Sequence, residues 1–110
     1  MNPTITFRGM QSSPPIEQYV QERIKKIEHI LSKEPSPKNL EVILEANTTH
    51  HHHIVELRLH SAHYHLRAQA EGADLYERID HVFGVLLNEI RKHKDKWISE
   101  RKEAGRPEEQ

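Results

Sequence analysis

A chain of 110 residues, 35% of them hydrophobic and 30% charged, is long enough for one domain with a modest hydrophobic core. Its 16 basic and 17 acidic residues give a formal net charge of −1, so a charged partner has to be recognised by a local cluster and not by the total charge. The lack of cysteine excludes a disulfide scaffold and thiolate metal sites, and no apolar run resembles a signal peptide or a membrane span, which together favour a cytoplasmic protein without membrane contact.

The first third of the chain predicts a strand followed by a helix. Residues 4–8 alternate polar and apolar side chains, as a half-buried strand does, and Gly9 ends them. The segment Ser12–Pro15 is a helix-start signal, and an apolar stripe then runs to about Ser32. The stripe consists of Ile16, Val20, Ile24, Ile27 and Leu31.

Three further strands are predicted over residues 40–46, 53–60 and 64–70, because apolar and polar side chains alternate along each of them. Ile43 is the exception, an apolar residue expected on the exposed face. Since every strand has one polar face, we expect helices to cover only one face of the sheet. The side chains expected to face inward are Leu40, Val42, Leu44, Ala46, Val55, Leu57, Leu59, Tyr64, Leu66, Ala68 and Ala70.

The last predicted helix begins at a cap and ends in a cluster of cations. Asp74 can accept backbone N–H bonds at the helix start, and Glu77 three residues later completes a capping-box pattern. Gly84 in mid-helix suggests close packing against a neighbour. The expected apolar stripe is Leu75, Ile79, Val82, Phe83, Leu86, Ile90 and Trp97. The cations that follow are Arg91, Lys92, Lys94, Lys96, Arg101 and Lys102, and such a cluster seeks phosphate.

These elements follow each other in the order β-α-β-β-β-α, which defines the fold class as α+β. A right-handed crossover through the first helix sets the first two strands parallel, and hairpins make the other pairs antiparallel. The prediction is a four-stranded mixed sheet with two helices packed on one face. We expect a single domain over residues 1–104 and a flexible tail over 105–110.

Two motifs in the last third carry a resemblance to a known family. They are Ala-Glu-Gly-Ala-Asp-Leu-Tyr at 70–76 and Lys-His-Lys-Asp-Lys at 92–96, with Ile79-Asp80 between them. With the element order, they make residues from about 4 to 98 resemble the ribosome hibernation promoting factor family, also known as the ribosome-associated inhibitor or protein Y family. The chain looks like the short form, which lacks the dimerisation domain of long members.

The resemblance implies a fold similar to double-stranded-RNA-binding domains and a protein that is not an enzyme, with no cofactor and no small-molecule substrate. It also implies binding to the small ribosomal subunit and its rRNA near the decoding region. Such a protein holds ribosomes inactive during stress or in stationary phase, and another hibernation factor is a further candidate partner.

Nine basic residues are candidates for RNA binding. Arg23 and Lys26 fall where the family carries basic residues, and three lysines in the motif at 92–96 match it directly, whereas Val85 and Asn88 replace residues that are basic in close relatives. From charge alone, a solvated face with ion pairs is the favoured interpretation for the cations of the first helix. For the cluster around Lys92 to Lys96, where carboxylates are sparse, RNA binding and placement for the helix dipole both stay open. The full set is Arg23, Lys25, Lys26, Arg91, Lys92, Lys94, Lys96, Arg101 and Lys102, of which Lys25, Arg91, Arg101 and Lys102 are auxiliaries.

The ten histidines suggest an alternative, a metal-binding protein. His50–His53 lie in a predicted turn, and alternate histidines on a strand point the same way, so His51 with His53, or His63 with His65, could chelate a divalent ion. Since no carboxylate or thiolate completes such a set, we predict exposed loop histidines and no resident metal.

A third alternative is a protein–protein adaptor that uses the outer sheet face. That face is predicted to carry Arg58 and Arg67 with several glutamates, for which cross-strand charge pairing is the favoured interpretation. Asp80 one turn after Tyr76 could suggest acid–base chemistry, but no nucleophile or glycine-rich loop accompanies it. We therefore predict no catalytic residues, and for Asp80 either a structural hydrogen bond or a surface charge.

Overall fold

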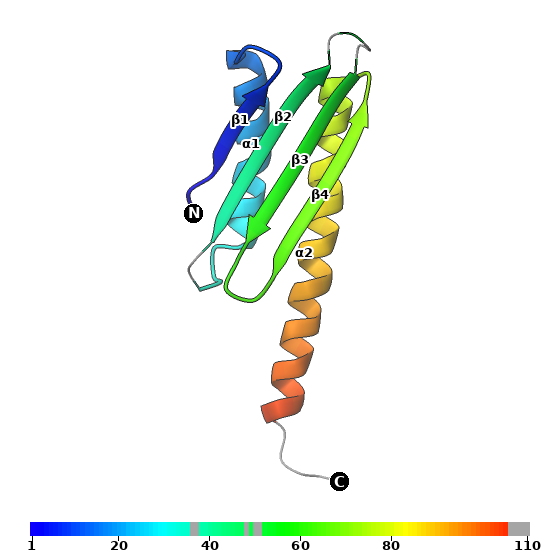
Figure 1. The fold of residues 1–110 in the computed structure, drawn as a ribbon. Coiled ribbons are helices and arrows are strands. Elements are labelled where there is room, and N and C mark those ends of the chain that lie inside the picture. Colours follow the sequence, from blue (N-terminus) through cyan, green and yellow to red (C-terminus); the bar gives the residue numbers. More distant parts are fainter. Residues whose placement is uncertain (36–37, 48, 50–51, 106–110) are drawn as a thin grey trace.

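The computed structural model describes residues 1–35, 38–47, 49 and 52–105, with the side chains of 97–105 outside that description. The elements follow the predicted order (Figure 1). They are β1 (Thr4–Arg8), α1 (Pro14–Ile30), β2 (Asn39–Asn47), β3 (His52–His60), β4 (His65–Gly72) and α2 (Leu75–Gly105). None of the helices in the described ranges is long and apolar enough to cross a membrane.

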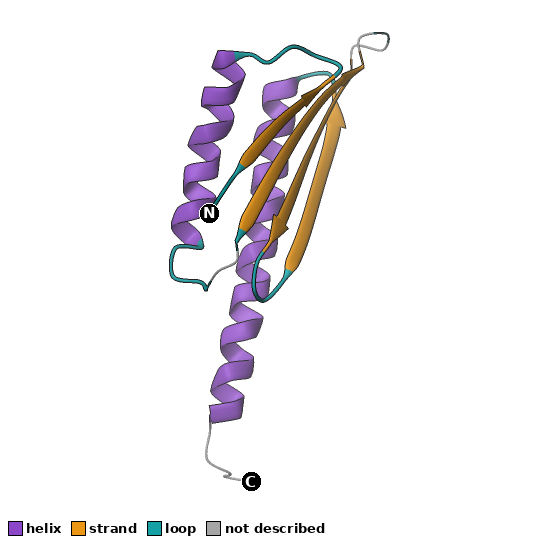
Figure 2. Ribbon diagram, turned by 60° about the vertical axis from the view of Figure 1, so that its left-hand side comes forward, coloured by secondary structure: helices purple, strands orange, loops and turns teal. Residues whose placement is uncertain are grey.

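The four strands form one mixed sheet in the order β1-β2-β3-β4. β1 pairs parallel with β2, while β2 with β3 and β3 with β4 pair antiparallel, so the predicted topology is confirmed. Both helices cover the same face of this sheet, and the other face is open (Figure 2). The α+β fold therefore has two layers.

The core fills the space between the sheet and the two helices. The two helical stripes and the inward strand residues predicted from periodicity supply most of its buried side chains. Ile16 and Leu66 pack against this core while staying partly exposed, and the side chain of Trp97 lies outside the described part of the chain.

The two helices begin in different ways. At α2, the carboxylate of Asp74 accepts a hydrogen bond of 3.2 Å from the backbone N–H of Glu77, as the capping pattern predicts. At α1, Ser13 makes no side-chain cap bond, and the first two helical positions are prolines without an N–H to cap.

Gly9 makes the tight connection after β1. Its φ of 65° is disfavoured for other residues, and a Cβ atom there would lie 2.6 Å from the carbonyl oxygen of Ala46. Glycine is therefore required at this position by both backbone conformation and space.

The expected exposure of Ile43 is wrong, because this side chain is only 2% exposed. Ile43 lies on a central strand, opposite Thr6 on β1 and Glu56 on β3. Glu56 is itself buried and forms ion pairs with Arg58 and Arg67 on the open face. We attribute the burial of Ile43 to neighbours on both sides, which alternation along a single strand does not reveal.

Helix α2 is longer than the sheet that it covers. Its 31 residues span about 46 Å at 1.5 Å per residue, whereas the strands have 5 to 9 residues. The second half of α2 therefore projects beyond the sheet (Figure 1).

Candidate nucleic-acid interface

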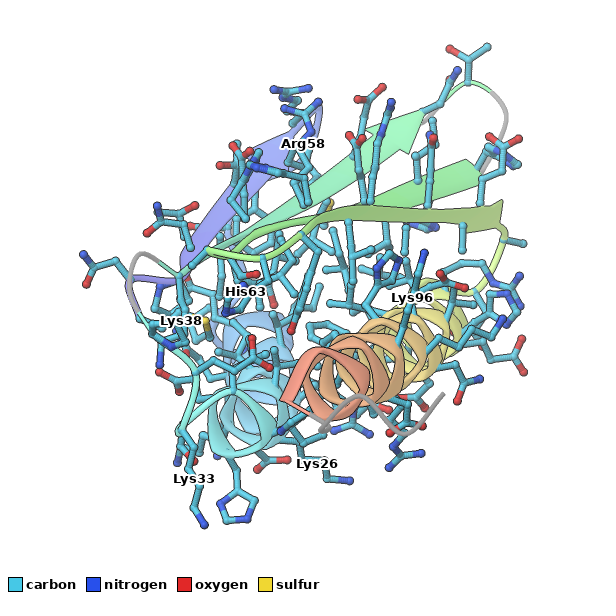
Figure 3. The ribbon with its side chains drawn as sticks, turned by 90° about the horizontal axis from the view of Figure 1, so that it is seen from below. Lys26, Lys33, Lys38, Arg58, His63 and Lys96 are labelled. Carbon is cyan, nitrogen blue, oxygen red and sulfur yellow. The ribbon has the colours of Figure 1, made fainter. Side chains whose placement is uncertain are left out.

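A groove runs between α1 and α2. Its larger hollow, about 440 Å³, is lined by Lys25, Lys26, His29, Ile30, Leu87 and Arg91. A smaller hollow of about 170 Å³ shares two of these residues and is lined by Arg23, Lys26, Asp80, Phe83, Gly84 and Leu87. Figure 3 shows Lys26 on the side of the helix layer that faces away from the sheet. We call the two hollows together the interhelical groove.

Three cations of the interhelical groove are available to an anionic ligand. Lys25, Lys26 and Arg91 are exposed, and none of them forms an ion pair with a carboxylate of the described residues. Both lysines come from α1 and Arg91 from α2, so packing of the two helices brings together charges that are far apart in the sequence.

Arg23, in contrast, already has interaction partners within the protein. Its Nε donates a hydrogen bond of 2.9 Å to Asp80, and its guanidinium lies 3.7 Å from the ring centroid of Tyr19. The Tyr19 hydroxyl donates at 2.8 Å to the same carboxylate. These contacts join α1 to α2 and show that Asp80, expected to be either a structural hydrogen-bond acceptor or a surface charge, accepts structural hydrogen bonds from Tyr19 and Arg23.

The cluster also affects the acidity of Tyr19. The hydrogen bond to Asp80 is the main reason why the pKa of Tyr19 is raised, because loss of the phenolic proton would break this bond and set two negative charges side by side. Tyr19 further contacts Tyr76, edge to face, with ring centroids 4.8 Å apart.

The cations of the 92–96 motif differ from one another. Lys94 Nζ donates a hydrogen bond of 2.9 Å to the backbone carbonyl of Ile30, the last residue of α1. Lys92 lies 3.6 Å from Glu89 in an exposed pair, and Lys96 has no ion pair among the described residues. Lys94 is therefore partly structural, while Lys92 and Lys96 remain accessible.

Helical geometry divides the candidates on α2 between two flanks. Successive residues are about 100° apart around the axis, so Arg91 lies on the flank of Leu87, and Lys92 and Lys96 lie 100° or more away. Figure 3 shows Lys96 and Lys26 pointing in different directions from the helix layer. Arg101 and Lys102 continue α2, but their side chains lie outside the described part of the chain.

Three groove residues, His29, Ile30 and Leu87, were not predicted from the sequence, and one expectation was wrong. Leu87 and His29 lie off the core stripes and outside the basic motif. Gly84 does not pack closely against a neighbour: it is exposed, and beyond its adjacent residues and the local helix backbone no atom of the described chain lies within 4 Å of a Cβ built there.

Several of the described histidines have partners within the protein. The expectation of exposed loop histidines is wrong for His52 and His53, which begin β3 and are half-buried. His52 lies 3.1 Å from a carboxylate oxygen of Glu71, and His53 Nδ1 lies 3.1 Å from the carbonyl of Ala73. His60 and His65 face each other with their Nδ1 atoms 2.6 Å apart. Within the described residues, no three histidine, aspartate or glutamate side chains are placed to hold a metal ion. His50 and His51 lie outside them.

The outer sheet face carries the predicted cross-strand charge pairs. Arg58 lies 3.5 Å from Glu41, its direct partner across β2 and β3, and 3.3 Å from Glu56. Arg67 on β4 also pairs with Glu56. Because these charges neutralise one another, the described side chains of this face form no unpaired basic cluster comparable to the interhelical groove.

Known proteins share the sequence pattern and the fold of this chain. The model of the family described as Sigma 54 modulation protein / S30EA ribosomal protein matches residues 4–98. A relative from Deinococcus radiodurans, named ribosome hibernation promotion factor, is 26% identical over 104 residues. The alignment covers 94% of this chain and 54% of the relative, so the chain spans about half the length of this curated relative.

Two solved structures have a similar fold. A ribosomal subunit interface protein from Coxiella burnetii has a TM-score of 0.70 and 21% identity, covering 86% of this chain and 99% of that one. The N-terminal domain of Protein Y from Thermus thermophilus also has a TM-score of 0.70, with 19% identity and coverage of 84% and 98%.

Proposed function

We propose that this chain, which belongs to the Sigma 54 modulation protein / S30EA ribosomal protein family, binds the small ribosomal subunit and holds ribosomes inactive. In this proposal it acts by stoichiometric binding near the decoding region, in the cytoplasm, under stress or in stationary phase. It is not an enzyme, in keeping with a family of ribosome hibernation and interface factors.

One observation carries the proposal beyond family membership. Lys25, Lys26 and Arg91 form a cluster without carboxylate partners among the described residues, on a protein whose net charge is only −1. Buried or paired cations serve the fold, but unpaired cations along a groove can replace the counterions of a phosphate backbone. Lys92 and Lys96 add two accessible charges on the other flank of α2.

Contacts of this kind position a protein on RNA without reading its sequence. Selectivity for a ribosomal site then comes from the shape of the rRNA into which the two helices and the projecting half of α2 fit. The two-layer fold is suited to this, because the sheet holds both helices in a fixed relation and leaves their outer sides open (Figure 2).

Co-sedimentation with purified ribosomal subunits tests this function. If about six phosphates are contacted, affinity should fall roughly a thousandfold between 50 and 200 mM salt. Lys25→Glu with Lys26→Glu should weaken binding at least tenfold. Lys33→Glu is the matched control, because Lys33 is exposed, follows α1 and lines neither hollow. Absence of binding at low salt, or binding that does not respond to salt, would contradict the proposal.

A further inference from the structure

The fold does not require glycine at position 84. It lies inside α2, where glycine is among the least favourable residues. Among the described glycines, Gly9 alone has a positive φ. The backbone of Gly84 is therefore in a conformation that residues with a side chain also adopt. No neighbouring atom would collide with a Cβ there either. Neither conformation nor packing explains glycine at this position.

The position of Gly84 in the groove suggests why a residue without a side chain is found there. It lines the smaller hollow with Lys26 and Leu87, which also line the larger one. A side chain at position 84 would extend into open space at the smaller hollow. Glycine therefore keeps the interhelical groove continuous and exposes the backbone of α2 to whatever lies in it.

The lining of the groove favours a ligand that is apolar on one part and anionic on another. Leu87 and Ile30 offer half-buried aliphatic surface, and Lys25, Lys26 and Arg91 surround it with positive charge. A nucleotide has this character, with a flat base and a charged phosphate. The larger hollow, about 440 Å³, is within the range of about 300 to 1,000 Å³ typical of small-ligand pockets.

We propose that the interhelical groove takes one unstacked nucleotide of a single-stranded rRNA segment, with its base against Leu87 and Ile30. The lysines and Arg91 hold the flanking phosphates, and the sugar–phosphate backbone passes close to α2 at Gly84. Duplex RNA is a poorer occupant, because its bases are stacked and paired, whereas bases in loops and bulges can be splayed out. This inference rests on the proposed function, since it defines how the same groove engages rRNA.

Substitutions at position 84 separate this role from stability. Gly84→Ala and Gly84→Leu should raise the melting temperature, because both residues favour helix and meet no clash. Gly84→Leu should nevertheless weaken binding to the small subunit at least tenfold, and Gly84→Ala by a smaller factor. Val85→Leu is the matched control, since it places the same side chain at an adjacent exposed position that lines neither hollow.

A Gly84→Leu protein that binds like the parent would overturn the inference while leaving the proposed function intact. If the parent itself does not bind, the proposed function fails. The occupant is identified by placing a photoreactive diazirine amino acid at position 87, or at position 85 as a control, in complexes with the small subunit. Crosslinks from position 87 to an rRNA nucleotide support the inference. Crosslinks to a ribosomal protein, or none, contradict it.

Discussion

The ammonium group of Lys94 on α2 lies 2.9 Å from the backbone carbonyl oxygen of Ile30, the last residue of α1. The final carbonyls of a helix have no partner within the helix, so this lysine satisfies one of them from another element. A favourable interaction with the negative end of the α1 dipole adds to this bond. A residue of the basic motif thus helps to hold the two helices in register.

Removal of the Lys94 ammonium should lower stability. We expect Lys94→Met to reduce the free energy of unfolding by about 1 kcal/mol, the usual net value of a partly buried hydrogen bond. Urea denaturation followed by circular dichroism measures the change. Lys92→Met is the control, because its pair with Glu89 is exposed and should contribute little. Equal losses in the two variants would show that the bond to Ile30 does not stabilise the fold.

Reversal of two accessible charges should affect binding and not folding. We expect Lys92→Glu with Lys96→Glu nearly to abolish association with the small subunit, because few carboxylates surround this end of the helix. Both side chains lie off the apolar stripe, so the melting temperature should stay within a few degrees of the parent. A double variant that melts normally and still co-sediments like the parent would rule out these lysines as phosphate contacts.

The buried pair of Tyr64 and Glu34 should stabilise the fold. The Tyr64 hydroxyl lies 2.9 Å from both carboxylate oxygens of Glu34, which is only 8% exposed. Tyr64→Phe leaves this carboxylate without its partner and should cost about 1 to 3 kcal/mol. Tyr76→Phe is the control, because Tyr76 is exposed and its hydroxyl makes no hydrogen bond within the described residues. Chemical denaturation of the parent and both variants measures the loss of unfolding free energy in each.

Stability should fall in alkaline solution, and Tyr64 should contribute to the fall. Burial, followed by the hydrogen bond to Glu34, raises the pKa of Tyr64 above its ordinary value of 10.0. Above pH 10 the unfolded chain loses this proton while the folded protein keeps it, so ionisation favours unfolding. The contribution is complete below pH 10 and decreases as the pH rises beyond it. Unfolding free energies measured between pH 9 and about 11.5 should therefore decline less steeply in Tyr64→Phe than in the parent.

The order of elements and most of the core could be predicted, because both depend on local periodicity. An amphipathic helix repeats every 3.6 residues and a half-buried strand every 2, and both patterns are visible in the sequence. Ile43 departs from its pattern because its burial depends on neighbours from β1 and β3. Alternation along one strand carries no information about such neighbours.

The basic residues of the site were visible in the sequence, but their partners were not. The bond from Arg23 to Asp80 joins residues 57 positions apart, and that from Lys94 to Ile30 joins residues 64 apart. Such pairings exist only after the helices have docked, so the sequence could not separate structural cations from available ones. The same docking brings Arg91, expected to be auxiliary, to the groove lined by Lys25 and Lys26.

The projecting half of α2 gives one helix two different local stabilities. The last polar or ring contacts between described side chains of α2 and the remainder of the fold are those of His93 with Tyr64 and of Lys94 with Ile30. Amides before this point should exchange with deuterium only through global opening, whereas those of the projecting turns can exchange by fraying from the end. A bound ribosome would slow exchange in the second group and hardly change the first. The amides in the first part of α2 thus serve as an internal reference for those of the projecting turns. The slowing of exchange along these turns would show how far the ribosomal contact extends.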